Sequence, residues 1–118
     1  MHRRRWRFYE TVSGAKPVQA FLDKLTPTEA AEVVAAMKEV AREGLRFARH
    51  LSGDIWEVRI EADRKAFRVL FSSEGKFQQV LLALEAFTKK TPKTPARTIH
   101  LAERRLADWR NRGRAGQH

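Results

Sequence analysis

Arginine and lysine side chains recur in one block of the sequence, residues 55–92, whose apolar pattern is typical of β-strands. Arg59 and Arg68 lie inside two neighbouring runs, IWEVRI and AFRVLF, and Lys89 and Lys90 directly follow a third run, VLLALEAF. Such cations bind phosphate groups, and they stabilise the negative charge that grows while a phosphodiester is cleaved. The block therefore predicts a surface that grips a phosphodiester.

The alternation of side chains within the first two runs predicts where the arginines point. Neighbouring residues of a strand project to opposite faces, so the apolar residues of each run share one face and the arginine takes the other. We therefore expect Arg59 and Arg68 on the reverse of a sheet whose apolar side is buried. One arginine there would be ordinary surface charge, but Arg64 and Lys65 lie in the turn between the runs, and like charges gather where an anion is bound. The apolar sets are Trp56, Val58 and Ile60, then Phe67, Val69 and Phe71.

Other reaction classes lack the residues that they need. The six glycines are scattered, so no glycine-rich loop cradles a phosphate, and no serine lies in a nucleophile elbow. The four histidines lack metal-ligand spacing and the carboxylates do not gather, so we expect no metal and no other cofactor. What remains is a set of cationic side chains. A ribonuclease needs no metal if the 2′-hydroxyl of the RNA attacks the adjacent phosphate, and cations can stabilise the phosphorane that forms.

Composition places the chain among small basic domains. Its 118 residues predict one domain, residues 1–112, followed by a frayed tail, residues 113–118. The formal net charge of +10 favours nucleic acid or an acidic protein as a partner. The absence of cysteine suits a reducing, cytoplasmic compartment. There is no signal-peptide pattern at the start and no apolar run of transmembrane length, so we expect no membrane partner.

Local signals predict the elements that carry these side chains. A first strand covers RRWRFYE, and a helix begins with Pro17 at its first position. Thr26, Pro27 and Glu29 form a capping box that starts a second helix, which ends at Gly44. The segment LRFARHLSGD is expected to be a connector. We expect His50, which lies within it, to be a structural or surface histidine.

Three strands and a last helix complete the predicted order, βααβββα. The last helix starts at Thr94, as N-cap, followed by Pro95, and it buries an apolar stripe. The fold class is therefore α+β, with a mainly antiparallel sheet and the helices on one face. The stripe consists of Ile99, Ala102, Leu106 and Trp109.

The chain resembles the RelE/ParE superfamily of bacterial type II toxins, and within it the HigB-like branch of phage-derived host-inhibition proteins. The resemblance rests on IWEVRI, AFRVLF, VLLALEAF, the exit TKKTPKTP and a closing helix with AERRLADW, in that order. It covers nearly the whole chain, from FYET to Trp109. It implies a RelE-like microbial ribonuclease fold. It also implies a metal-independent mRNA endoribonuclease that acts in the ribosomal A site and is neutralised by a HigA-like helix-turn-helix antitoxin.

The resemblance also implies roles for individual residues. Arg68 matches the arginine that stabilises the reacting phosphate, and Arg59 matches a basic residue that positions the backbone or assists proton removal. Lys89 falls where the group places a further catalytic cation. The RelE type carries a reactive tyrosine near its C-terminus, where this chain offers only His100 as an acid or base. Further cations expected to contact RNA are Arg64, Lys65, Lys90, Lys93 and Arg97.

Two other functions fit parts of the sequence. A ParE-like gyrase inhibitor belongs to the same superfamily, but such chains generally lack the set Arg59, Arg68 and Lys89. A non-catalytic module could use the same cations only to contact phosphates. A neighbouring gene for a helix-turn-helix protein would favour a toxin over a free-standing binding module, and a translation assay would separate the nuclease from the gyrase inhibitor.

Overall fold

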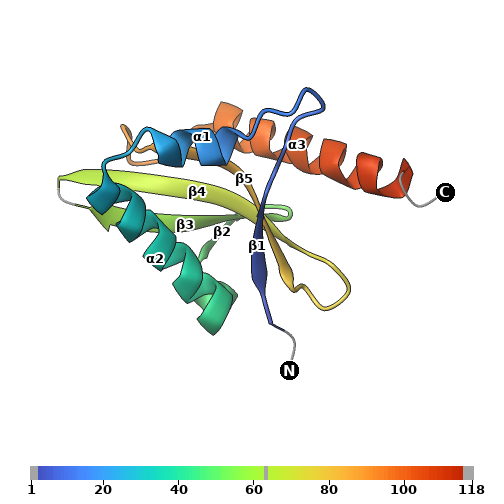
Figure 1. Cartoon of the computed structure of the whole chain (residues 1–118), viewed down its shortest axis with the longest axis horizontal. Helices are drawn as coiled ribbons and strands as arrows, with labels where there is room; N and C mark the ends of the chain where they lie inside the picture. Colours follow the sequence, from blue (N-terminus) through green and yellow to red (C-terminus); the bar gives the residue numbers. More distant parts are fainter. Residues whose placement is uncertain (1–2, 63, 116–118) are drawn as a thin grey trace.

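The structure is a computed structural model that describes residues 3–62 and 64–115 (Figure 1). The element order confirms the predicted α+β class and adds one strand, β2, where the sequence predicted a connector. The elements are β1 (Arg5–Phe8), α1 (Pro17–Asp23), α2 (Pro27–Glu43), a 3₁₀ turn (Leu45–Phe47), β2 (Arg49–Ser52), β3 (Ile55–Ala62), β4 (Lys65–Glu74), β5 (Val80–Thr88) and α3 (Ala96–Ala115).

The five strands form one sheet in the order β1-β5-β4-β3-β2. Neighbouring strands are antiparallel except for β1 and β5, which run parallel, so the sheet is mixed. β3 and β4 form a hairpin, in which Arg59 and Arg68 are direct partners across the ladder. The two arginines singled out in the sequence therefore lie side by side.

The helices cover both faces of the sheet, so the expectation that all of them lie on one face is wrong. α1 and α2 pack on the face that carries Val58, Phe67 and Phe71, as the alternation predicted. α3 packs on the opposite face, against Leu70 and Leu82. Because β4 and β5 are apolar on both sides, each face has to be covered. The face that carries Arg59 and Arg68 is therefore partly covered by α3 and is not fully open to solvent.

Sequence signals set the limits of α2 as expected. The Thr26 hydroxyl accepts a hydrogen bond from the Glu29 backbone N–H at 3.1 Å, and the Glu29 carboxylate accepts one from the Thr26 N–H at 3.0 Å. At the other end Gly44 has φ of 99°, a left-handed conformation that favours glycine. The capping box and the stop at Gly44 are confirmed.

The last helix differs from its expected limits at both ends. It begins at Ala96, and the Pro95 carbonyl accepts its first backbone hydrogen bonds, whereas the Thr94 hydroxyl bonds to a neighbouring strand. It continues to Ala115, into the segment expected to fray, and residues 116–118 lie outside the described part of the chain. None of the helices within the described residues is both long and apolar enough to cross a bilayer.

Candidate functional site

A cavity of about 390 Å³ lies on the α3 face, where β2, β3 and β4 meet the segment between β5 and α3. Five of its lining side chains are basic and one is acidic, which gives the cavity a strongly positive character. Such a surface attracts anions and raises their local concentration. The lining residues that carry charge are Arg49, Glu57, Arg59, Arg68, Lys89 and Lys93.

Glu57 lies beneath the two arginines of the β3–β4 hairpin. Its Oε1 accepts a hydrogen bond from Arg59 Nε at 3.1 Å and forms an ion pair with Arg68 Nε at 3.7 Å. Two like charges directly opposite one another in a sheet repel, and the carboxylate offsets that repulsion. Arg68 is only 4% exposed, and its Nη1 also donates to the Phe67 carbonyl at 2.8 Å. The Arg59 side chain, by contrast, is 46% exposed.

Thr94 joins the same carboxylate from the segment that leads into α3. Its hydroxyl donates to Oε2 of Glu57. One side chain of β3 therefore contacts β4 through Arg68 and the pre-helical segment through Thr94. This arrangement closes one side of the cavity.

A β-bulge in β5 sets the direction of the side chains that follow it. Leu70 of β4 is paired with Glu85, but the next residue, Phe71, is paired with Ala83, so one residue of β5 is extra. Before the bulge, Leu82 faces α3, and after it the alternation is reversed, so that Phe87 faces α3. Bulges commonly redirect side chains next to functional sites. Here the bulge places Phe87 and Lys89 in the lining of the cavity.

Arg105 of α3 holds this bulge. Its Nη1 donates to the Leu84 carbonyl at 2.8 Å and forms an ion pair with Oε1 of Glu85 at 3.3 Å. The same carboxylate oxygen accepts a hydrogen bond from the Ala86 backbone N–H at 3.1 Å. Backbone groups beside the bulge are thus satisfied by Arg105 of α3 and by Glu85 of β5 itself.

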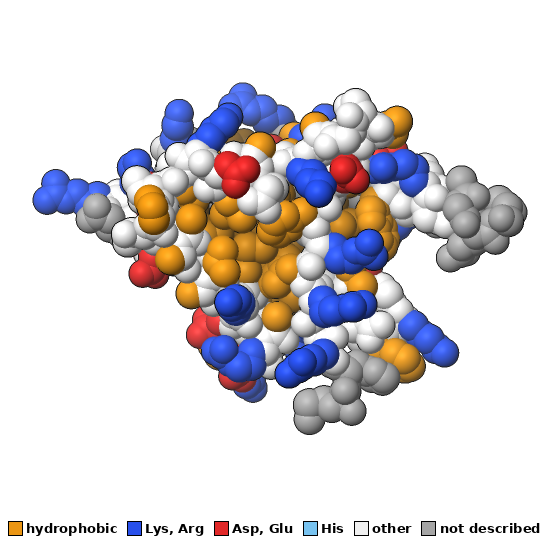
Figure 2. All heavy atoms as spheres, viewed as in Figure 1, with side chains coloured by type: hydrophobic (Ala, Val, Ile, Leu, Met, Phe, Trp, Pro, Cys, Tyr) orange, Lys and Arg blue, Asp and Glu red, His pale blue; other side chains and the backbone are white. Residues whose placement is uncertain are grey.

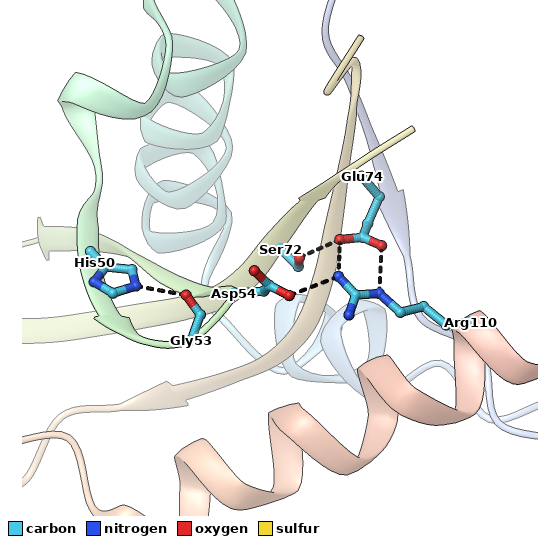
Figure 3. A network of polar contacts seen from close by, with 6 residues as sticks. All are labelled: His50, Gly53, Asp54, Ser72, Glu74 and Arg110. Carbon is cyan, nitrogen blue, oxygen red and sulfur yellow. Dashed lines mark hydrogen bonds and ion pairs between the residues drawn. The ribbon is translucent and has the colours of Figure 1, made fainter. Parts of the chain in front are cut away.

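The far half of α3 is fastened by a second charged network, shown in Figure 3. Arg110 donates to both oxygens of Glu74, at 2.9 and 2.8 Å, and to Asp54 in the β2–β3 turn at 3.0 Å. These hydrogen bonds, first that to Glu74, raise the pKa of Arg110 above its ordinary range. Glu74 also accepts a hydrogen bond from Ser72 at 2.6 Å. The network holds α3 to β4 and to the turn, away from the cavity.

The structure brings four of the sequence-predicted cations to one cavity, namely Arg59, Arg68, Lys89 and Lys93. Three others line a shallow depression beside it, and Lys89 lines both hollows. Of these three, Lys65 forms an ion pair with Glu29 at 3.3 Å. Two predicted residues, Arg97 and His100, are exposed on the first turns of α3 and line neither hollow. The three residues of the depression are Arg64, Lys65 and Lys90.

Among the charged and hydroxyl-bearing residues of the cavity, sequence reasoning missed three: Arg49, Glu57 and Thr94. Glu57 has the same parity as Arg59 in IWEVRI, a signal that was available in the alternation. Arg49 was hidden because its strand was expected to be a connector, although it pairs with Glu57 in the sheet. Thr94 was expected to cap a helix.

His50, in the middle of the chain, and Tyr9, near its start, both make contacts within the fold. His50 Nε2 lies 2.7 Å from the Gly53 carbonyl (Figure 3). The His50 ring packs edge-on against Trp56. Tyr9, the sole tyrosine, is buried and donates to Asp108 at 2.6 Å. Tyr9 does not line the cavity. No group of three or more His, Asp or Glu side chains within residues 3–62 and 64–115 is arranged to hold a metal ion.

Comparison with known proteins agrees with the resemblance at the level of the family. No curated protein matches the chain. The model of one family, described as Phage derived protein Gp49-like (DUF891), matches residues 20–107, which include α2, the whole β2–β5 part of the sheet and the cavity. Because this match covers well over half of the sequence, the chain belongs to the Gp49-like phage-derived protein family, a RelE/HigB-type family associated with the toxins of toxin–antitoxin systems.

Proposed function

We propose that the chain is a HigB-like toxin that cleaves mRNA in the ribosomal A site, and so inhibits translation in the cytoplasm. The observation that supports this most is the cavity on the α3 face, where five cations surround one buried carboxylate. Its charge and shape suit a single phosphodiester bridged by arginines.

In the proposed reaction, the 2′-hydroxyl of the RNA attacks the adjacent phosphorus and the 5′-oxygen of the next nucleotide leaves. Arg68, at the floor of the cavity, stabilises the negative charge of the phosphorane, and the more exposed Arg59 binds the incoming phosphate. Lys89 stabilises the leaving oxygen from the rim. The products are a 2′,3′-cyclic phosphate and a 5′-hydroxyl, and no bond to the protein forms.

Proton transfer explains why the ribosome would be required. Among the described lining residues, the Glu57 carboxylate accepts from Arg59 and Thr94, and His50 is engaged with the Gly53 carbonyl. These contacts within the chain hold in place the two side chains of the cavity that could take the proton of a 2′-hydroxyl. Correct orientation of the RNA therefore has to supply much of the rate, and orientation alone can be worth several kcal/mol, about 7–11 in the best cases. We expect naked RNA to be cleaved poorly.

The partner that neutralises the toxin is proposed to be a HigA-like helix-turn-helix protein that docks on α1 and α2, around residues 29–42. Figure 2 shows apolar side chains gathered between α1, α2 and β1, with Lys and Arg side chains around them. A hollow of about 290 Å³ on this face is lined by Trp6, Phe8, Lys16 and Gln19. An acidic, partly apolar partner suits such a surface. Lys38→Glu, on the exposed side of α2, should weaken the complex and leave the toxicity unchanged.

Mapping mRNA 5′ ends after brief expression in bacteria tests the proposed activity. The wild-type chain should arrest growth and produce new 5′ ends inside translated frames, and Arg59→Ala should produce far fewer. Intact mRNA combined with broken or relaxed DNA would instead identify a gyrase inhibitor. Growth without either change would leave a phosphate-binding module as the better description.

A further inference from the structure

We propose that Glu57 is a positioning residue, whose buried carboxylate fixes the direction in which Arg59 and Arg68 present their donors to a phosphate. The inference deepens the proposed function and rests on it for the identity of the ligand, an RNA phosphodiester. The geometry itself is independent of that function, because it concerns contacts within the chain.

The burial of Glu57 is the first observation. Its side chain is 1% exposed, and carboxylates are almost never buried to this degree unless they are paired. A buried ion pair is a weak source of stability, because apolar residues of similar volume often serve the fold as well or better. A carboxylate in this place is therefore better explained by the arrangement of its partners than by stability.

The atoms that Glu57 uses are the second observation. It contacts the Nε of both Arg59 and Arg68, at 3.1 and 3.7 Å, and thereby occupies the same edge of the two guanidinium groups. The Arg59 side chain is 46% exposed and lines the cavity. A guanidinium held along one edge can still offer paired N–H donors to a phosphate.

The link to Thr94 is the third observation. Through it, the same carboxylate holds the segment between β5 and α3, which contributes Pro92, Lys93 and Thr94 to the lining. Both oxygens of Glu57 thus accept hydrogen bonds from side chains that line the cavity, Arg59 and Thr94. Positioning is the role that its contacts support.

Three variants test the role. Glu57→Gln removes the charge and keeps the volume, and Thr94→Val removes one hydrogen bond and keeps the carboxylate. Glu74→Gln is the matched control, because Glu74 is also a mostly buried carboxylate bonded to an arginine, Arg110, but lies outside the cavity. Cleavage is measured on mRNA in ribosomal complexes, and exchange of the arginine Nε–H protons is followed by NMR in the free protein.

We expect Glu57→Gln to lower kcat about 100-fold with little change in KM, since small misplacements of reacting groups can cost that much. Exchange of the Arg59 and Arg68 Nε–H protons should become faster. Thr94→Val should lower kcat less, in the same direction, and Glu74→Gln should leave kcat unchanged. If Glu57→Gln does not fold, Thr94→Val and Glu57→Asp provide the same comparison.

Two results would overturn the inference: a folded Glu57→Gln variant with wild-type kcat, or equal losses of kcat in Glu57→Gln and Glu74→Gln. A wild-type chain that leaves mRNA intact would overturn the proposed endoribonuclease instead. The exchange measurement would still decide the inference in that case. Faster exchange in Glu57→Gln alone supports it, and unchanged exchange contradicts it.

Discussion

The two faces of the sheet are built from different kinds of contact. The buried side chains of the face under α1 and α2 are apolar, and Phe67 and Phe71 among them are fully buried. The α3 face buries Leu70 and Leu82, but it also holds every buried charged or polar side chain in the described part of the chain. Those residues are Glu57, Arg68 and Ser72.

The α1/α2 face therefore accounts mainly for the stability of the fold, whereas the α3 face carries the side chains of the candidate site. Burial of apolar area is the main source of stability. The α1/α2 face buries apolar side chains and none of the buried charged or polar ones, Glu57, Arg68 and Ser72. Buried charge costs free energy unless it is paired. Each buried side-chain polar atom within the described residues has a hydrogen-bond partner, which limits that cost on the α3 face. Departures from an apolar core are expected mainly at functional or strained sites.

The largest effect on stability should come from the apolar face. Phe71→Ala removes a fully buried ring that packs edge-on against Trp6, with ring centroids 5.0 Å apart. We expect a loss of about 3–5 kcal/mol in the free energy of unfolding, measured by urea denaturation, with activity per folded molecule unchanged. Phe47→Ala, at a ring that is 45% exposed, is the control and should cost far less. Similar losses at both positions would contradict the division between the faces.

Arg68→Ala should act on both activity and stability. Loss of one transition-state cation commonly lowers kcat by about 10²–10³, and Glu57 would lose one of its partners in a buried place. We therefore expect a lower melting temperature too. Arg104→Ala, at an exposed position of α3 that lines neither hollow, is the control for both readouts. A fully active Arg68→Ala variant would show that the cavity is not the active site.

Arg105→Met tests whether the contacts of α3 with the bulge in β5 hold the lining residues that follow the bulge in place. Hydrogen bonds to charged groups contribute about 1.5–3 kcal/mol, so we expect a stability loss in that range and a fall in kcat, because Lys89 loses its fixed position. Arg104→Met, one residue away at an exposed site, should change neither quantity. Loss of stability without loss of kcat would restrict Arg105 to a structural role.

Alkaline pH should weaken the attachment of α3 at Tyr9. Burial, followed by the hydrogen bond to Asp108, raises the pKa of Tyr9 above its ordinary value of 10.0. A raised pKa in the folded state means that the neutral phenol stabilises the fold fully below pH 10, and that this contribution is lost as pH rises through the folded pKa. The free energy of unfolding of the wild type should therefore approach that of Tyr9→Phe above pH 10.

The phenolate absorbance reports Tyr9 alone, because the chain has no other tyrosine. Titration of that absorbance should give a midpoint above 10.0 in the folded protein and a lower one in urea. A difference in stability between the wild type and Tyr9→Phe that does not change with pH would contradict the assignment.

The apolar face was predictable from the sequence, and the α3 face only in part. Alternation in IWEVRI and AFRVLF gave the buried sets correctly, and the capping box at Thr26 placed α2, because these signals are local. No such local signal predicts the bulge in β5. It lies within LLALEA, where all residues but Glu85 are apolar, so apolar residues face both sides of the sheet. A reversal of the alternation there leaves the apolar pattern of the sequence unchanged.

The charged contacts of the cavity escaped prediction for a related reason. Glu57 and Thr94 are 37 positions apart, and their contact depends on how α3 crosses the sheet. Parity alone put Arg59 and Arg68 on the same face, but it could not show that a helix would bury one and leave the other half exposed. Tertiary packing of this kind is not encoded in the periodicity of any single element.

Single-turnover cleavage of mRNA with a defined codon in the ribosomal A site tests the central claim most directly. Arg59→Ala is the informative variant, because the side chain is half exposed and its removal should leave the fold intact. Arg104→Ala, an exposed cation outside the cavity, is the matched control for net charge. We predict 2′,3′-cyclic phosphate ends, a rate about 10²–10³ lower for Arg59→Ala, and an unchanged rate for Arg104→Ala. Equal rates for Arg59→Ala and the wild type, or mRNA that stays intact with the wild type, would contradict the assignment of the α3-face cavity as a ribonuclease site.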